Sequence, residues 1–223
     1  MRDRFRCWLA AVAALLLAGA GCTSGKILYL PGDLTRPTAP VMTSAAPEEP
    51  VVAVLDFTYA GTPPYEIGRD FDHARSIVWQ SDPGKELANL VADVLKEQGI
   101  PAVRVSGESD VPVNATAKVW GQVDELRVYT KKTGSLRLSI EISSSITATL
   151  HASGGSAPPG WSSNLSSDYM STEPLFITPG SVRNAVSGAA NTVAEEAVKR
   201  LISAGAVHRP AGWQEPPREE RTR

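Results

Sequence analysis

The side chains best suited to chemistry gather in one stretch, Arg69–His73 (R-D-F-D-H). Asp70, Asp72 and His73 offer three oxygen or nitrogen ligands within four residues, and Asp56 ends an apolar run earlier in the chain. A cluster of this kind is one way to begin a metal site. No second ligand cluster appears elsewhere in the sequence, so a solvated acidic loop is the better interpretation. We expect no metal and no cofactor.

Nucleophilic catalysis has equally little support. His151 lies at the polar end of a predicted strand and His208 lies near the C-terminus, and neither has a carboxylate and a nucleophile at a suitable spacing. The sequence also lacks a glycine loop of the kind that cradles phosphate. We therefore expect a protein that is not an enzyme, with no catalytic residues. A formal net charge of -2 gives no basic footprint for nucleic acid.

The N-terminus has the pattern of a secretory signal peptide over residues 1–21. Arg2, Arg4 and Arg6 precede the thirteen uncharged residues of Trp8–Ala20, which end in small side chains. This apolar segment is too short to be a membrane-spanning helix. Removal of the peptide would leave 19 basic and 23 acidic side chains in the mature chain.

The residues Gly19–Cys22 (G-A-G-C) resemble the lipobox of bacterial lipoproteins, although Gly19 stands where that motif usually has Leu. The resemblance implies that Cys22 becomes the acylated first residue and anchors the chain in a membrane. Thr23 and Ser24 follow, with no Asp retention signal; by resemblance to Gram-negative lipoprotein sorting, this implies the outer membrane, on its periplasmic side. The alternative is a plain secreted protein with an incidental cysteine.

Residues 22–50 are predicted to form a tether. Five prolines in this segment remove backbone donors and fix φ, which disfavours helix and central strand. A flexible tether of about 28 residues would reach roughly 30 Å. Ile27–Leu30 (I-L-Y-L) is an exception that could add a short strand to the domain.

Leu136–Ala152 predicts a long strand with one buried face. Its even positions are apolar except Ser144, and its odd positions are polar, as expected when successive side chains alternate between faces. Upstream, Lys118–Thr130 changes phase, because its apolar set moves from odd to even positions. A strand can do this only by inserting a residue, so we predict a β-bulge near Asp124–Glu125.

The remaining elements complete an α+β domain over residues 51–205. Val51–Phe57 and Ala102–Val105 predict strands on either side of a helix that is capped by Asp82 and ended by Gly99. Trp161–Met170 predicts another strand, and a stripe of small apolar residues predicts a helix at Ser181–Ala204. The element order is then β-α-β-β-β-β-α. It indicates a two-layer sandwich, in which two helices cover one face of a mostly antiparallel sheet of about five strands. Residues 206–223 are expected to be a disordered polar tail.

The long connection Thr58–Gln80 contains two glycines and two prolines, with a further short strand allowed at Ser76–Trp79. Connections of this length inside a compact domain are usually functional or mobile.

One face of the predicted sheet is a candidate contact surface. If the helices cover Val119 and Val123, Trp120 points to the opposite face, and the bulge brings Tyr129 to that face as well. The basic side chains of Lys118 and Arg127 accompany them. We therefore predict partner binding by Lys118, Trp120, Arg127 and Tyr129. The alternative is that Ile27–Leu30 folds back and covers Trp120.

The chain resembles the YajG-type family of bacterial envelope lipoproteins over about Val51–Ala204. The motifs that carry the resemblance are the signal with Cys22, V-A-V-L-D-F at 52–57, I-G-R at 67–69, K-E-Q-G-I-P at 96–101 and V-W-G-Q-V at 119–123. A similar architecture occurs in auxiliary lipoproteins of ABC-type envelope transport systems. The resemblance implies a tethered, non-catalytic envelope protein, and it supplies no catalytic residues.

Two functions are compatible with these patterns. The first is an outer-membrane lipoprotein whose periplasmic domain binds an envelope protein or a glycan. The second is an auxiliary subunit of an ABC-type lipid or solute transport system. The sequence predicts no oligomeric state.

Overall fold

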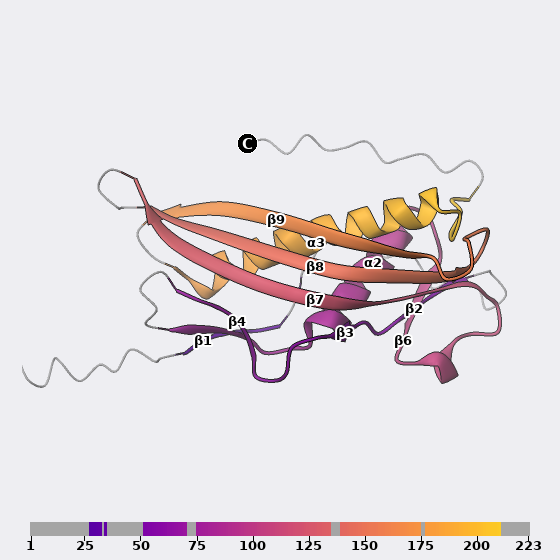
Figure 1. Cartoon of the computed structure of the whole chain (residues 1–223), viewed down its shortest axis with the longest axis horizontal. Helices are drawn as coiled ribbons and strands as arrows, with labels where there is room; N and C mark the ends of the chain where they lie inside the picture. Colours follow the sequence, from indigo (N-terminus) through magenta and orange to yellow (C-terminus); the bar gives the residue numbers. More distant parts are fainter. Residues whose placement is uncertain are drawn as a thin grey trace, which may run out of the picture.

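The computed structural model describes residues 27–32, 34, 51–70, 75–134, 139–174 and 177–210. In these residues the chain forms a two-layer α+β sandwich, with a nine-stranded sheet and two helices packed on one of its faces (Figure 1). The strands are β1 (Ile27–Leu30), β2 (Val51–Leu55), β3 (Thr58–Tyr59), β4 (Tyr65–Arg69), β5 (Ser76–Trp79), β6 (Ala102–Val105), β7 (Ala115–Thr133), β8 (Ser139–Gly154) and β9 (Ser162–Pro174). The helices are α2 (Pro83–Glu97) and α3 (Pro179–Ser203), and a 3₁₀ turn spans Glu108–Asp110.

Strand β7 is the central element of the sheet. One of its edges pairs with β8 in antiparallel fashion, from Ala117 opposite Gly154 to Thr133 opposite Ser139. Its other edge pairs in turn with β2, β3 and β4, all of which run parallel to it. Figure 1 shows β7, β8 and β9 as three long strands side by side, with the short strands along the free side of β7.

The alternating pattern predicted for the long strand is confirmed in β8. Each even position from Ile140 to Ala152 is buried and each odd position is half-buried on the opposite face. Leu136 and Leu138, which begin the predicted pattern, lie outside the described residues.

The predicted β-bulge in β7 is also confirmed. The pairing of β7 with β8 shifts between Val123 and Glu125, so Asp124 is the inserted residue. Val119 and Val123 are buried before the shift, and Leu126 and Val128 are buried after it. The extra residue therefore keeps the apolar side chains of both halves on the helix side of the sheet.

Both helices begin and end close to the predicted positions. The Asp82 carboxylate accepts a hydrogen bond from the Gly84 amide at 2.9 Å, and Gly99 follows the helix with a φ of 72°. Helix α3 begins two residues earlier than predicted, because Thr178 forms a capping box with Ser181 and Pro179 fills the first helical position.

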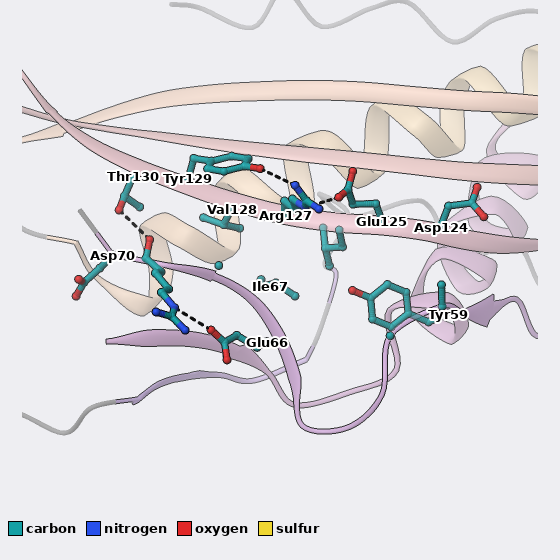
Figure 2. A pocket seen from close by; sticks show the side chains of 15 residues that line it. Tyr59, Glu66, Ile67, Asp70, Asp124, Glu125, Arg127, Val128, Tyr129 and Thr130 are labelled. Atoms are coloured by element: carbon teal, nitrogen blue, oxygen red, sulfur yellow. Dashed lines mark hydrogen bonds and ion pairs between the residues drawn. The ribbon is translucent and has the colours of Figure 1, made fainter. Parts of the chain in front are cut away.

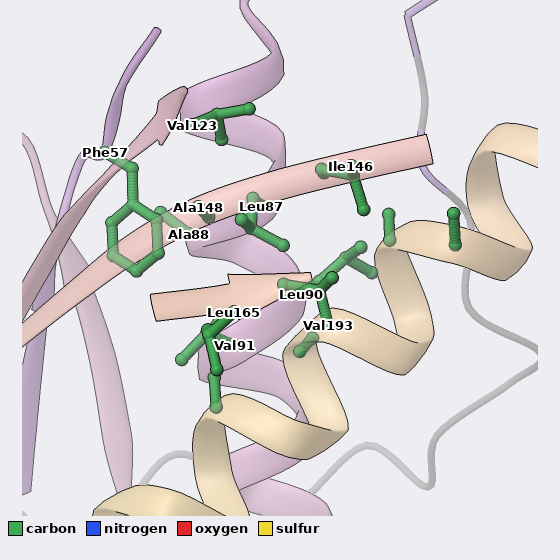
Figure 3. Close-up of a cluster of buried hydrophobic side chains, with 14 of the residues drawn as sticks. Phe57, Leu87, Ala88, Leu90, Val91, Val123, Ile146, Ala148, Leu165 and Val193 are labelled. Atoms are coloured by element: carbon green, nitrogen blue, oxygen red, sulfur yellow. The ribbon is translucent and has the colours of Figure 1, made fainter. Parts of the chain in front are cut away.

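The main core lies between the helices and the sheet. Figure 3 shows part of it, where Leu87, Leu90 and Val91 of α2 meet Val123 of β7, Ile146 of β8 and Val193 of α3. Helix α3 contributes many small side chains, which let it approach β8 and β9 closely. At Gly188, for example, a Cβ atom would lie 2.6 Å from the Tyr169 ring.

Three boundaries differ from the prediction, and tertiary contacts explain each. The sheet gains strands because the connection from 58 to 80 forms β3 and β4 in addition to β5, whose bounds match the short strand that the sequence allowed at Ser76–Trp79. Several of the added pairings are parallel rather than antiparallel. Ile27–Leu30, the exception named within the predicted tether, adds a short strand to the domain as β1 beside β5. Ala206 and Val207, at the start of the predicted tail, are buried in the core.

Substitutions on the two faces of β8 should separate core from surface. We expect Ile140→Ala to lower the free energy of unfolding by about 2–5 kcal/mol, because Ile140 is buried in the main core. The neighbouring Ser139→Ala should change it by less than about 0.5 kcal/mol. Denaturant unfolding measures both values, and equal effects would contradict the assigned faces of β8.

Ser144 is a polar side chain on the buried face of β8. It is 1% exposed, and its hydroxyl has no hydrogen-bond partner among the residues that the structure describes. Removing an unpartnered buried hydroxyl avoids its desolvation cost, so we expect Ser144→Ala to stabilise the fold by about 1 kcal/mol. Ser145→Ala, on the opposite face, is the matched control and should leave the unfolding midpoint unchanged. A destabilised Ser144→Ala protein would show that the hydroxyl has a partner.

Candidate binding site at a gap in the sheet edge

The candidate site arises from a mismatch in chain length beside β7. Tyr59 at the end of β3 pairs with Val123, and the next pairing on this edge joins Gly68 of β4 to Val128. Eight residues, 60–67, therefore lie beside only four residues of β7, 124–127. The surplus chain must loop away, so residues 124–127 have no strand partner on this edge among the described residues.

The gap forms a cavity of about 660 Å³ (Figure 2). Its walls come from the end of β3 and the loop after it, from β4, and from the middle of β7. The lining residues are Tyr59, Ala60, Gly61, Glu66, Ile67, Gly68, Arg69, Asp70, Asp124, Glu125, Leu126, Arg127, Val128, Tyr129 and Thr130. A volume of this size is typical of ligand-binding pockets.

Gly68 closes one end of the cavity. A Cβ atom at this position would lie 2.1 Å from the Val128 carbonyl oxygen, closer than any side chain tolerates. Glycine therefore allows β4 to come close enough to β7 for the pairing to resume. Thr130 supports the same end, since its hydroxyl donates a hydrogen bond to the Arg69 carbonyl at 3.3 Å.

Tyr59 bounds the other end of the cavity. Its hydroxyl is hydrogen-bonded to the backbone of Leu126, within residues 124–127, for which the described residues supply no strand partner on this edge. Its ring packs edge-on against Tyr65, with 5.5 Å between the ring centroids. Burial raises the pKa of the Tyr59 hydroxyl, and the Glu125 carboxylate adds to the rise, whereas the Leu126 hydrogen bond opposes it.

Charged side chains of both signs surround the cavity and pair locally. Arg69 contacts Glu66 on the same strand, β4, with 3.2 Å between Nε and Oε1, and Figure 2 marks the contact with a dashed line at Glu66. Arg127 pairs with Glu125 and donates a hydrogen bond to the Tyr129 hydroxyl at 3.1 Å. The Tyr129 hydrogen bond and the Glu125 charge raise the pKa of the Arg127 guanidinium. Tyr129 itself stays 53% exposed, so its ring is available for contact.

The acidic loop does not have the predicted solvated character at Asp70. This side chain is 2% exposed, and its Oδ2 lies 2.8 Å from the Arg75 Nε. Asp70 therefore joins the ends of β4 and β5, which is a structural role. Asp72 and His73 lie outside the described residues. In the part of the chain that the structure describes, no three His, Cys, Asp or Glu side chains are placed to hold a metal ion.

Asp56 and His151 also have structural contacts. The Asp56 carboxylate lies 2.6 Å from Arg104 on β6 and 3.9 Å from Lys85 on α2, so it links three elements. The His151 ring stacks on Trp120, with centroids 5.6 Å apart.

Trp120 faces away from the helices, as predicted, but it is half-covered. It packs against a small second core formed by Ala53, Leu55 and Val105. The alternative cover, Ile27–Leu30, is wrong because β1 pairs with β5 and buries its inner side chains in the main core. Neighbouring strands β2 and β6 therefore supply the cover.

The four predicted partner-binding residues do not form one patch. Arg127 and Tyr129 line the cavity, whereas Lys118 pairs with Glu108 at 2.9 Å near the other end of β7. At about 3.3 Å per residue, Trp120 and Tyr129 lie about 30 Å apart along the strand. Sequence reasoning missed Tyr59, Glu66 and Gly68, for which the length of the 58–80 connection was the available signal.

The anchor residue Cys22 and the signal segment 1–21 lie outside the described residues, so acylation stays a prediction. Within the described residues, no helix has the length and apolar character needed to cross a membrane.

Comparisons with known proteins leave the family open. No family model matches the sequence. No curated protein matches it either. The chain is similar in structure to a Xanthomonas campestris protein of the DUF330 family, at 10% identity and a TM-score of 0.49, covering 80% of this chain and 96% of that one.

Two further solved structures are similar at lower scores. PelC from Paraburkholderia phytofirmans, crystallised as a dodecamer, is 17% identical, with a TM-score of 0.38 and coverage of 71% of this chain and 93% of that one. A minor lipoprotein from Acinetobacter baumannii is 9% identical, with a TM-score of 0.31 and coverage of 66% and 93%. These scores leave the YajG-type resemblance a prediction.

Proposed function

We propose that this chain is a non-catalytic, lipid-anchored outer-membrane protein whose periplasmic domain binds an extended segment of an envelope protein. The observation that carries the proposal is the cavity beside β7, where a strand edge that has no strand partner among the described residues adjoins exposed Tyr129.

The chemistry of the cavity favours a polypeptide over a glycan. Extended peptides bind exposed strand edges through backbone hydrogen bonds, and side-chain pockets beside the edge supply specificity. Residues 124–127 form a short stretch of such an edge, in which the Leu126 backbone is already hydrogen-bonded to the Tyr59 hydroxyl. Tyr59 and Tyr129 add aromatic rings, which are enriched where proteins contact one another.

The charged side chains of the cavity suit binding better than catalysis. Glu66 and Glu125 are each paired with an arginine, and Asp124 accepts hydrogen bonds from Gln122 and Thr149, both at 2.9 Å. Positioned charges of both signs select a partner by complementarity.

Acylation of Cys22 should decide where the protein is found. We expect the chain with Cys22→Ser to fold as the original does and to leave the membrane fraction, because the buried acyl chains supply the attachment. Cell fractionation with antibody detection measures the distribution. A matched Ser24→Ala variant should stay in the membrane fraction. Complete retention of Cys22→Ser with membranes would show that another feature holds the protein there.

A photocrosslinking amino acid at Tyr129 should identify the partner in intact cells. We expect it to capture a specific envelope protein, whereas the same probe at Met170, which is 64% exposed on β9 outside the cavity, should not. Adding Gly68→Ala to the Tyr129 probe should abolish the capture, because a Cβ atom there disturbs the wall of the cavity.

The outcomes of the crosslinking experiment are distinct. Capture of a permease subunit would make the protein an auxiliary component of a transport system. Equal capture from Tyr129 and Met170 would contradict a role for the cavity. Loss of the Tyr129 signal on enzymatic removal of envelope glycans would assign the site to a glycan.

A further inference from the structure

Strand β1 has a surface that the binding cavity does not use. Its inward side chains, Leu28 and Leu30, are buried in the main core. Its outward side chains, Ile27 and Tyr29, are 43% and 55% exposed. Because alternate residues of a strand share a face, Ile27 and Tyr29 form an apolar pair on the side of the sheet away from the helices.

The position of this pair is fixed by the sheet. All four residues of β1 pair in register with β5, from Ile27 opposite Ser76 to Leu30 opposite Trp79. Val78, the residue of β5 opposite Tyr29, is 6% exposed, so the exposed apolar surface is formed by the two β1 side chains. β1 ends the strand order β1-β5-β4-β7-β2-β6, so its outer edge has no strand partner among the described residues.

The length of chain before β1 limits how far this pair can be from the anchor. Ile27 follows Cys22 by five residues. A fully extended chain rises by at most about 3.5 Å per residue, so the two α-carbons are no more than about 18 Å apart. The expected tether of about 28 residues is thus shortened to five by the pairing of β1 with β5.

We infer that the Ile27 and Tyr29 face of β1 rests on the lipid bilayer, with both side chains in the headgroup region. This inference depends on the acylation of Cys22 in the proposed function, which holds that residue at the membrane surface. Tyrosine suits this environment because its ring is apolar and its hydroxyl stays hydrated, and aromatic residues are enriched at the membrane–water interface. The acylated end and the β1 face then form two contacts with one membrane and fix the orientation of the domain.

A fluorescent label at residue 29 tests the contact. Cleavage of the signal peptide removes Cys7, and acylation blocks the thiol of Cys22. Tyr29→Cys therefore places a single reactive thiol in the mature protein. We would label this variant with an environment-sensitive fluorophore and reconstitute the acylated full chain in vesicles of phosphatidylethanolamine and phosphatidylglycerol. Some vesicles would carry nitroxide-labelled lipids as quenchers.

Val113→Cys is the matched control. Val113 is a fully exposed apolar residue, but it precedes β7 and lies about 50 Å along that strand from Val128, which pairs with β4. We expect a blue shift and at least threefold quenching at residue 29, with neither at residue 113. Adding Ile27→Ser should reduce the quenching at residue 29.

The possible failures are separable. If mass spectrometry shows acylated Cys22 but the label at residue 29 remains unquenched, the membrane contact is wrong and the anchor stands. A blue shift that grows with protein concentration without quenching would indicate that a second copy of the chain covers β1. Absence of acyl chains from Cys22 would overturn both the anchor and the membrane contact.

Discussion

The backbone pairing of β7 is the constraint on which the rest of the structure depends. This strand is nineteen residues long, and one long hairpin partner, β8, satisfies one of its edges. Three short parallel strands share the other edge, because the chain reaches it in separate passes. Buried backbone groups must find partners, so each short strand takes the position where β7 still offers them. Where one short strand ends before the next begins, the edge of β7 is irregular, as it is between β3 and β4.

The gap between β3 and β4 shows how such an irregularity is tolerated. The Tyr59 hydroxyl binds the backbone of Leu126, where a neighbouring strand would otherwise supply a partner. The bulge at Asp124 lies in the same stretch, and bulges are common beside functional sites. Gly68 then lets pairing resume without a clash against Val128. A side-chain hydroxyl, an inserted residue and a missing Cβ together keep an open cavity in an otherwise continuous sheet.

The residues that looked most reactive in the sequence have structural roles where the structure describes them. Asp70 pairs with Arg75 in a buried position, and Asp56 joins β2 to β6 through Arg104. A buried carboxylate that loses its partner is costly, so the pair of Asp70 with Arg75 fixes the connection between β4 and β5 more than it adds net stability. The exposed pairs around the cavity, such as Arg69 with Glu66, contribute little to stability.

The sequence alone determined the elements whose side chains repeat at regular spacing. The faces of β8, the bulge in β7 and the ends of α2 followed from alternation, phase and capping residues, because these signals are local to each segment. Tertiary structure alone decided the docking of β1 beside β5, the formation of β3 and β4 within the 58–80 connection, and the cavity that brings Tyr59 to Arg127 and Tyr129. Those features depend on which backbone edge is free when distant segments meet. The periodicity of one segment does not indicate which edge of a distant strand is free. The lengths of β7 and of the short strands beside it determine which part of its edge is free.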